Sequence, residues 1–194
     1  VGSYLQRAGY AVDLAFTGPD AIEAARSAEP DVVVLDLGLP GLDGIEVCRQ
    51  LRTFTDCYVL MLTARTDEID KILRLSVGAA DYITKPFSPR ELVARVRVVL
   101  RRPRRPVVSG DEAQPPRVFG DLEVDLDGRQ VRVAGRPVEL TRTEFDILAL
   151  LASSPKVAFS RRRILEGVWD PGWAGGEDVV DVHMAHLRRK LGDD

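Results

Sequence analysis

The sequence predicts two domains: an α/β domain with a doubly wound parallel sheet, and a smaller domain that opens with an antiparallel sheet and continues in helices. Strand and helix patterns alternate over residues 1–100, which is typical of a parallel sheet with crossover helices. Residues 101–117 are rich in proline and arginine and show little apolar periodicity, as expected of a linker. Residues 118–194 change to short alternating runs followed by helical spacing.

The composition of the 194 residues excludes several classes of protein. With 45% hydrophobic and 29% charged residues, the chain can bury two cores and is not disordered. Its apolar runs, such as residues 59–62, fall far short of the ~20 residues of a membrane helix, so we expect no membrane partner. The two cysteines make no disulfide framework. A net charge of −3 excludes a general polyanion-coating protein, so nucleic-acid contacts have to come from local basic clusters.

In the first domain, the alternation of Val12, Leu14 and Phe16 predicts a strand over residues 11–16, and Thr17 is placed to cap the next helix. The other strands are expected over residues 32–35, 58–62 and 81–83, and the other helices over residues 1–9, 45–52, 67–77 and 89–100. The continuous apolar runs of the second and third strands are typical of strands buried on both faces. In such sheets, chemistry lies beyond the carboxyl ends of the strands.

Turn and cap signals divide the second domain. Asp127-Gly128 and Ala134-Gly135 separate alternating runs and predict β-hairpins. Thr141 and Glu144 have the spacing of a capping box, and Ser160 is placed to cap a second helix. A third helix is expected over residues 177–191, with one face inward and the other exposed. The inward stripe comprises Val180, Met184, Leu187 and Leu191, and the exposed face comprises Val179, Val182, Ala185, His186 and Arg189.

Three polar residues, Asp36, Thr63 and Lys85, stand where strands of the first domain end. If the crossovers make these strands neighbours, a carboxylate, a hydroxyl and an ammonium converge on one edge of the sheet. This set suits phosphoryl transfer, with Asp36 as nucleophile, Lys85 paired with the phosphoryl oxygens and Thr63 hydrogen-bonded to one of them. Mg²⁺ would offset the charge, held by Asp36 and the backbone carbonyl of Gly38 in a tight glycine-containing loop. A cis Lys85–Pro86 bond is one way to aim the lysine inward.

Other phosphate-binding motifs fit less well. An aspartate that ends an apolar strand could hold the metal of a P-loop NTPase, but the required GxxxxGK[ST] is absent. The glycines after Asp36 spell GxxGxxG and not the dinucleotide-binding fingerprint.

Residues 31–44, 62–64 and 78–87 closely resemble the receiver domain of bacterial response regulators. Residues 179–191 resemble the winged-helix effector of the OmpR/PhoB subfamily. The resemblance implies a flavodoxin-like receiver followed by a winged helix-turn-helix domain, in a cytoplasmic bacterial protein.

This resemblance implies a phosphorylation switch. A sensor histidine kinase would phosphorylate Asp36, and Thr63 and Tyr82 would then shift together. The chain would be a phosphoacceptor and not an enzyme, with self-catalysed phosphotransfer at most. In the family, the acidic pair that holds Mg²⁺ ends a first strand, whereas this chain begins within the first helix, so weak Mg²⁺ binding is expected. We expect roughly 15–20 residues to precede Val1 and the family's β-hairpin wing to follow Asp194.

The family forms dimers through its fourth helix, fifth strand and fifth helix. Matching positions predict that Lys71 pairs with Glu91, and Asp81 with Arg95, across the two-fold axis. Exposed pairs of this kind contribute ~0–1 kcal/mol each. The alternative is that these charges pair within one chain or face solvent.

The resemblance also places the third helix of the second domain in the major groove, with a dimer bound to direct-repeat DNA. Residues expected to read bases are Val179, Val182, Ala185 and His186. Residues expected to contact phosphates are Arg161, Trp169, His183 and Arg188. The loop over residues 170–176 matches the family's contact with RNA polymerase. Because His186 stands where a basic residue is usual, we expect DNA affinity to rise below about pH 6.5 as it is protonated.

Two other functions remain open on the sequence. One is a DNA-binding regulator that needs no phosphorylation. The other is a metal-dependent aspartyl phosphatase, although Gly38 stands where such an enzyme has its second carboxylate.

Overall fold

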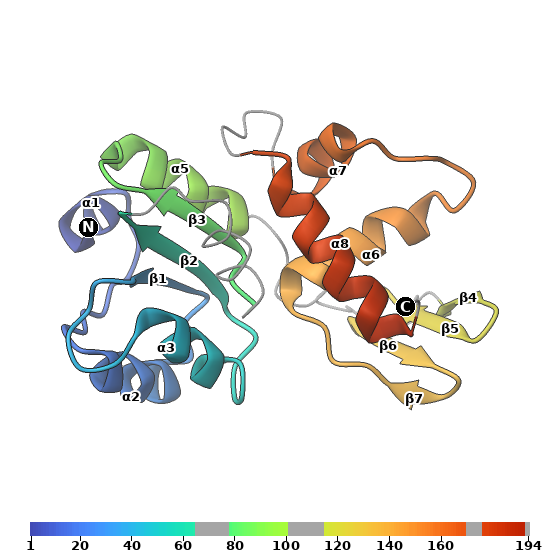
Figure 1. The fold of residues 1–194 in the computed structure, drawn as a ribbon, viewed down its shortest axis with the longest axis horizontal. Coiled ribbons are helices and arrows are strands. Elements are labelled where there is room, and N and C mark those ends of the chain that lie inside the picture. The colour runs from blue at the N-terminus through green and yellow to red at the C-terminus, as the bar shows by residue number, and fades with distance from the viewer. Residues whose placement is uncertain (65–77, 101–114, 170–175, 193–194) are drawn as a thin grey trace. The chain divides into compact units, whose positions relative to one another are not determined.

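The computed structural model describes residues 1–64, 78–100, 115–169 and 176–192 (Figure 1). The chain folds as two compact units, Val1–Arg101 and Arg102–Asp194. The first contains a parallel sheet and the second an antiparallel sheet followed by helices. The fold class predicted for the chain is therefore confirmed. The helix expected over residues 67–77 lies outside the described residues.

The sheet of the first unit has the strand order β1-β2-β3, with both pairs parallel. Its strands are β1 (Val32–Asp36), β2 (Tyr58–Thr63) and β3 (Asp81–Thr84). Its helices are α1 (Gly2–Arg7), α2 (Gly18–Ala28), α3 (Gly44–Leu51) and α5 (Pro89–Leu100). Helices α1 and α5 cover one face of the sheet, and α2 and α3 lie on the other side (Figure 1).

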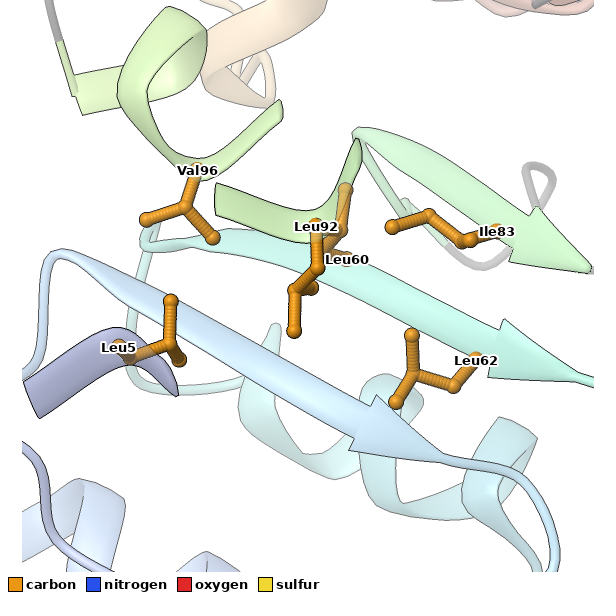
Figure 2. Close-up of a cluster of buried hydrophobic side chains, with 6 residues drawn as sticks. All are labelled: Leu5, Leu60, Leu62, Ile83, Leu92 and Val96. Carbon is orange, nitrogen blue, oxygen red and sulfur yellow. The ribbon is translucent and has the colours of Figure 1, made fainter. Parts of the chain in front are cut away.

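A hydrophobic core joins α1 and α5 to the sheet (Figure 2). It is formed by Leu5, Leu60, Leu62, Ile83, Leu92 and Val96. Because side chains alternate along a strand, Val59 and Met61 of β2 point to the opposite face, where they are also buried. Fully burying a leucine contributes about 1.5–3 kcal/mol, so burial on both faces anchors β2 at the centre of the sheet and holds its carboxyl end in place.

The structure corrects two local expectations. Residues 11–16 form no strand, and Leu14 and Phe16 are 60% and 72% exposed. A strand needs a neighbour that accepts its backbone hydrogen bonds, and no described strand pairs with this segment. Residues 32–34 of β1 are half-buried and not fully buried, because β1 pairs with β2 alone among the described strands.

The loop after β1 is held close to the start of α3. Asp43 caps α3, because its Oδ1 accepts a hydrogen bond from the Ile45 amide at 2.8 Å. Gly44 allows this close approach, since a Cβ there would lie 2.7 Å from Leu37 Cδ2 and 2.9 Å from Leu37 Cα. The backbone that follows Asp36 is therefore packed directly against α3.

The second unit begins with a four-stranded antiparallel sheet of order β4-β5-β6-β7. Its strands are β4 (Arg117–Phe119), β5 (Leu122–Asp125), β6 (Gln130–Val133) and β7 (Arg136–Pro137). Its helices are α6 (Arg142–Ser153), α7 (Arg161–Val168) and α8 (Asp178–Leu191). Both predicted hairpins are confirmed, since residues 127–128 lie between β5 and β6 and residues 134–135 between β6 and β7.

The predicted helix caps are also present. Thr17 and Ser160 each accept a backbone amide hydrogen bond at the start of α2 and α7. The capping box of α6 is complete: Thr141 Oγ1 accepts from the Glu144 amide at 3.3 Å, and Glu144 Oε2 accepts from the Thr141 amide at 2.8 Å.

Candidate functional site

The carboxyl ends of the three parallel strands bring Asp36, Thr63 and Lys85 together. The register pairs Asp36 with Leu62, the residue before Thr63, and pairs Thr63 with Thr84, the residue before Lys85. Lys85 Nζ donates a hydrogen bond to Asp36 Oδ2 at 2.5 Å, and the Lys85 amide donates to the Thr63 carbonyl at 2.6 Å. A carboxylate, a hydroxyl-bearing residue and an ammonium therefore share one edge of the sheet.

Asp36 is accessible and is held in its charged form. The side chains of Asp36 and Lys85 are 36% and 37% exposed, whereas Thr63 is buried. Partial burial acts to raise the pKa of Asp36, but hydrogen bonds from the Lys85 ammonium and the Gly38 amide outweigh it, so this pKa is lowered. A partly exposed, ionised carboxylate beside an ammonium is a suitable nucleophile for phosphoryl transfer.

Thr63 and Tyr82 lie on one face of the sheet. Tyr82 of β3 pairs with Met61 of β2, and side chains two positions apart on a strand share a face. Tyr82 is half-buried. The Lys85–Pro86 peptide bond is cis.

The described residues supply only part of a Mg²⁺ site. Mg²⁺ takes an octahedral set of oxygen ligands. Both Asp36 oxygens already accept hydrogen bonds, Oδ2 from Lys85 and Oδ1 from the Gly38 amide at 2.9 Å. Over the described ranges, no three His, Cys, Asp or Glu side chains gather where they could hold a metal. Asp36 and the Gly38 carbonyl do not complete such a site by themselves.

The Asp81–Arg95 pair that was expected across a dimer axis forms within one chain. Arg95 Nη1 lies 2.7 Å from Asp81 Oδ2, and Nη2 lies 2.8 Å from Glu91 Oε1. The two elements that carry them pack together, since Ile83 of β3 and Leu92 of α5 belong to one core. Arg95 therefore reaches both carboxylates within one chain, as in the intrachain alternative, and the pairing across a dimer axis stays a prediction. Lys71 lies outside the described residues.

Helix α8 turns inward a face different from the predicted one. Its buried residues are Val179, Val180, Val182, His183, His186 and Leu187. Its exposed residues are Asp181, Ala185, Arg188, Arg189 and Lys190, and Met184 and Leu191 are half-buried. Successive residues of a helix are ~100° apart around its axis. On this basis, the centre of the buried face of α8 lies about a quarter turn around the helix from the centre of the predicted inward stripe.

The structure buries several side chains that were expected to be exposed for contact with DNA. Val179, Val182 and His186 are buried and not exposed for base reading. His183 and Trp169, expected at phosphates, are 1% and 3% exposed, and their rings lie 5.8 Å apart. Among the predicted DNA-contacting residues, only the side chains of the following remain on the surface of the described structure: Arg161, Ala185 and Arg188.

A buried carboxylate contributes to this orientation, together with the burial of Val179, Val180, Val182 and Leu187. Glu144 Oε2 accepts a hydrogen bond from Lys190 Nζ at 2.7 Å, and Glu144 Oε1 lies 3.8 Å from His186 Nδ1. A count of apolar residues along α8 misses the attraction between the Glu144 carboxylate and the Lys190 ammonium. The spacing of His186 and Lys190, four residues apart on one helix face, is the sequence signal that could have revealed it.

The pKa of His186 is lowered and not raised. Burial is the main cause, Glu144 acts in the opposite direction, and Arg189 and Lys190 lower the pKa further. The expected gain in DNA affinity near pH 6.5 loses its basis, because this imidazole is buried and resists protonation.

An exposed ion pair connects the start of α7 to α8. Arg161 Nε lies 2.8 and 3.0 Å from the two carboxylate oxygens of Asp181. The side chains are 58% and 56% exposed. Arg161 therefore lies beside the exposed face of α8 that carries Ala185 and Arg188.

The fold and the site together define a class: an α/β domain with an exposed carboxylate beside an ammonium at its sheet edge, followed by a smaller unit with an antiparallel sheet and helices. Family comparison agrees. The model of the response regulator receiver domain matches residues 1–97, and that of the C-terminal domain of transcriptional regulatory proteins matches residues 135–194. The chain belongs to the OmpR/PhoB-type response regulators.

Individual relatives cover nearly the whole chain. The transcriptional regulatory protein CseB of Streptomyces coelicolor is 47% identical over 197 residues, covering 98% of this chain and 84% of the relative. The alkaline phosphatase synthesis transcriptional regulatory protein PhoP of Bacillus subtilis is 43% identical over 192 residues, covering 96% of this chain and 80% of the relative. A solved structure of a RitR mutant is similar with a TM-score of 0.75 and 28% identity, covering 98% of this chain and 82% of that one.

None of the helices in the described part of the chain combines the length and hydropathy that a bilayer crossing needs.

Proposed function

We propose that this response regulator is switched by phosphorylation of Asp36 by a sensor histidine kinase and then binds direct-repeat DNA as a dimer. One observation carries the proposal: the Lys85 ammonium lies 2.5 Å from Asp36 Oδ2, with Thr63 at the end of the strand between them. Response regulators act with sensor kinases and DNA in general, and family models match both parts of the chain.

The proposed transfer uses groups already in place. An oxygen of Asp36 forms a bond to the phosphorus of a phosphohistidine, and the P–N bond to that histidine breaks. The lowered pKa of Asp36 keeps it ionised at neutral pH, so no general base is required. Lys85 would offset charge on the phosphoryl oxygens, and the Thr63 hydroxyl would hydrogen-bond one of them. Receiver domains in general bind Mg²⁺, which would supply further positive charge beside the phosphoryl group.

A shift of Thr63 would be passed to the neighbouring strand. Because Thr63 and Tyr82 share a face of the sheet, a Thr63 side chain drawn toward the phosphoryl group changes the space available to Tyr82. In the proposed dimer, α5 and β3 face a second copy, with Glu91 of one chain paired to Lys71 of the other. Asp81 and Arg95 stay paired within each chain.

In the effector, we place α8 in the major groove. Ala185 offers an apolar contact to a base, and Arg188 and Arg161 offer charges for phosphates. The proposed contact with RNA polymerase involves residues 170–176, of which 170–175 lie outside the described residues. A cytoplasmic location follows from the proposed kinase and DNA partners.

The test is phosphorylation of the protein expressed from its intact gene. Incubation with acetyl phosphate and Mg²⁺ is expected to add about 80 Da, the mass of one phosphoryl group, to the peptide that contains Asp36. Asp36→Asn is expected to take up none. Multiple turnover of acetyl phosphate would instead indicate a phosphatase. An unmodified protein that still binds DNA would indicate a phosphorylation-independent regulator.

A further inference from the structure

We infer that Glu144 positions helix α8 and thereby helps to select the DNA sequence without touching DNA. This inference rests on the proposal that α8 enters the major groove. Glu144 lies in the first turn of α6, and its side chain is 2% exposed. Its partners come from the last two turns of α8, so one buried carboxylate connects two helices.

Glu144 has two roles at once. Its Oε2 accepts the Thr141 amide at 2.8 Å, which closes the capping box of α6, and it also accepts Lys190 Nζ at 2.7 Å. Its Oε1 lies 3.8 Å from His186 Nδ1. The capping role alone needs no residue of α8, so the contacts with Lys190 and His186 are additional.

These contacts help to determine how α8 is rotated about its axis, together with the buried apolar side chains of the helix. His186 and Lys190 are four residues apart and therefore lie on the same face of the helix. An ionised carboxylate is costly to bury unless it is paired. Turning α8 so that Lys190 pointed away from α6 would leave the Glu144 carboxylate buried without this ammonium. The helix is therefore held with this face against α6.

The opposite side of α8 is left as the surface available to DNA. Asp181, Ala185 and Arg188 follow one another at spacings of four and three residues and form a single exposed stripe. Asp181 is engaged by Arg161 of α7, which provides a second connection on the exposed side. Loss of the Glu144 contacts would let the helix turn and would change which side chains meet the bases.

Glu144→Gln tests this inference in the full-length chain. Glutamine is also common at this position of a capping box, so the cap at the start of α6 is preserved. The substitution removes the negative charge that faces Lys190 of α8. The probe is a pool of DNA duplexes with a randomised core, from which the wild type selects its preferred site. Glu144→Gln is expected to bind that site roughly tenfold more weakly and to enrich a different set of sequences.

The sign of the effect separates positioning from charge. Glu144→Gln makes the protein more positive by one unit, which by general electrostatics strengthens DNA binding. Weaker binding to the selected site, with binding to random DNA unchanged or tighter, supports positioning. Equal or tighter binding to the selected site, with the wild-type sequence preference, overturns it.

Two further variants separate positioning from loss of stability. Thr141→Ala removes the capping hydroxyl but leaves the Lys190 contact, so it is expected to lower the melting temperature and keep the wild-type preference. Lys190→Arg keeps the charge and is expected to keep the preference, whereas Lys190→Met is expected to change it as Glu144→Gln does. A preference changed by Thr141→Ala, or kept by Lys190→Met, overturns the inference. A wild type that enriches no sequence contradicts the proposed function instead.

Discussion

The guanidinium of Arg95 on α5 lies 2.7 Å from the carboxylate of Asp81 on β3, and the two side chains are 10% and 1% exposed. The same guanidinium also donates two hydrogen bonds to Glu91. One arginine thus connects the third strand to the helix that packs on it. This network forms within a single chain.

Arg95→Met is expected to destabilise the protein by about 3–5 kcal/mol, because it leaves the Asp81 carboxylate buried without this cation. Urea denaturation measures the change in the free energy of unfolding. The matched control is Arg97→Met on the same helix, where an exposed arginine is removed and the effect is expected within about 0.5 kcal/mol. Equal effects of the two variants would contradict a buried stabilising pair.

Lys85→Met is expected to raise the pKa of Asp36. The variant loses the hydrogen bond and the charge of Lys85, both of which lower this pKa. Partial burial, which raises the pKa, is then opposed only by the hydrogen bond from the Gly38 amide. In the wild type, the lowered pKa makes Asp36 contribute stability above its unfolded pKa, and this contribution is lost as the pH falls through the folded pKa. Titration of the Asp36 carboxyl carbon by NMR measures the shift. Lys156→Met, an exposed lysine of the second unit, is the control and is expected to leave the titration unchanged.

His186→Gln is expected to flatten the dependence of stability on pH. Well above about pH 6.5, the ordinary pKa of histidine, His186 binds almost no proton in either the folded or the unfolded chain. As the pH falls, the unfolded chain takes up a proton that the folded chain resists, so the free energy of unfolding decreases until the lowered pKa is passed. The groups that face His186 are Glu144, Arg189 and Lys190, and all three remain in the variant. Urea unfolding from about pH 8 to about pH 5.5 compares the slopes, and the same slope in both proteins would rule out this role for His186.

Arg188→Ala is expected to weaken DNA binding almost equally for all sequences. As an exposed cation placed for a phosphate, Arg188 would release about one counterion, so the slope of log affinity against log salt is expected to decrease by about 1. Fluorescence anisotropy at several salt concentrations measures this slope. Arg162→Ala, an exposed arginine paired with Glu166, is the control on α7. A loss confined to one DNA sequence would assign Arg188 to base reading.

The candidate phosphoacceptor site was predictable because it depends on local signals. Asp36, Thr63 and Lys85 each directly follow or end a strand, and parallel strands joined in order place their carboxyl ends side by side. The helix caps were predictable for the same reason, since Thr141 and Glu144 are three residues apart. The strand predicted over residues 11–16 is absent from the structure. Alternation describes only a segment's own side chains, whereas a strand also needs a neighbouring strand to pair with.

The sequence by itself determined the order of the elements, the caps and the residues that end the strands, because these follow from periodicity and from contacts within one turn or strand. Only the tertiary structure decided which carboxylate Arg95 contacts and which face of α8 is buried. Both outcomes depend on Asp81 and Glu144, carboxylates brought in from distant parts of the chain. Burying a charge is favourable only beside a suitable partner, and no pattern within a single helix specifies that partner.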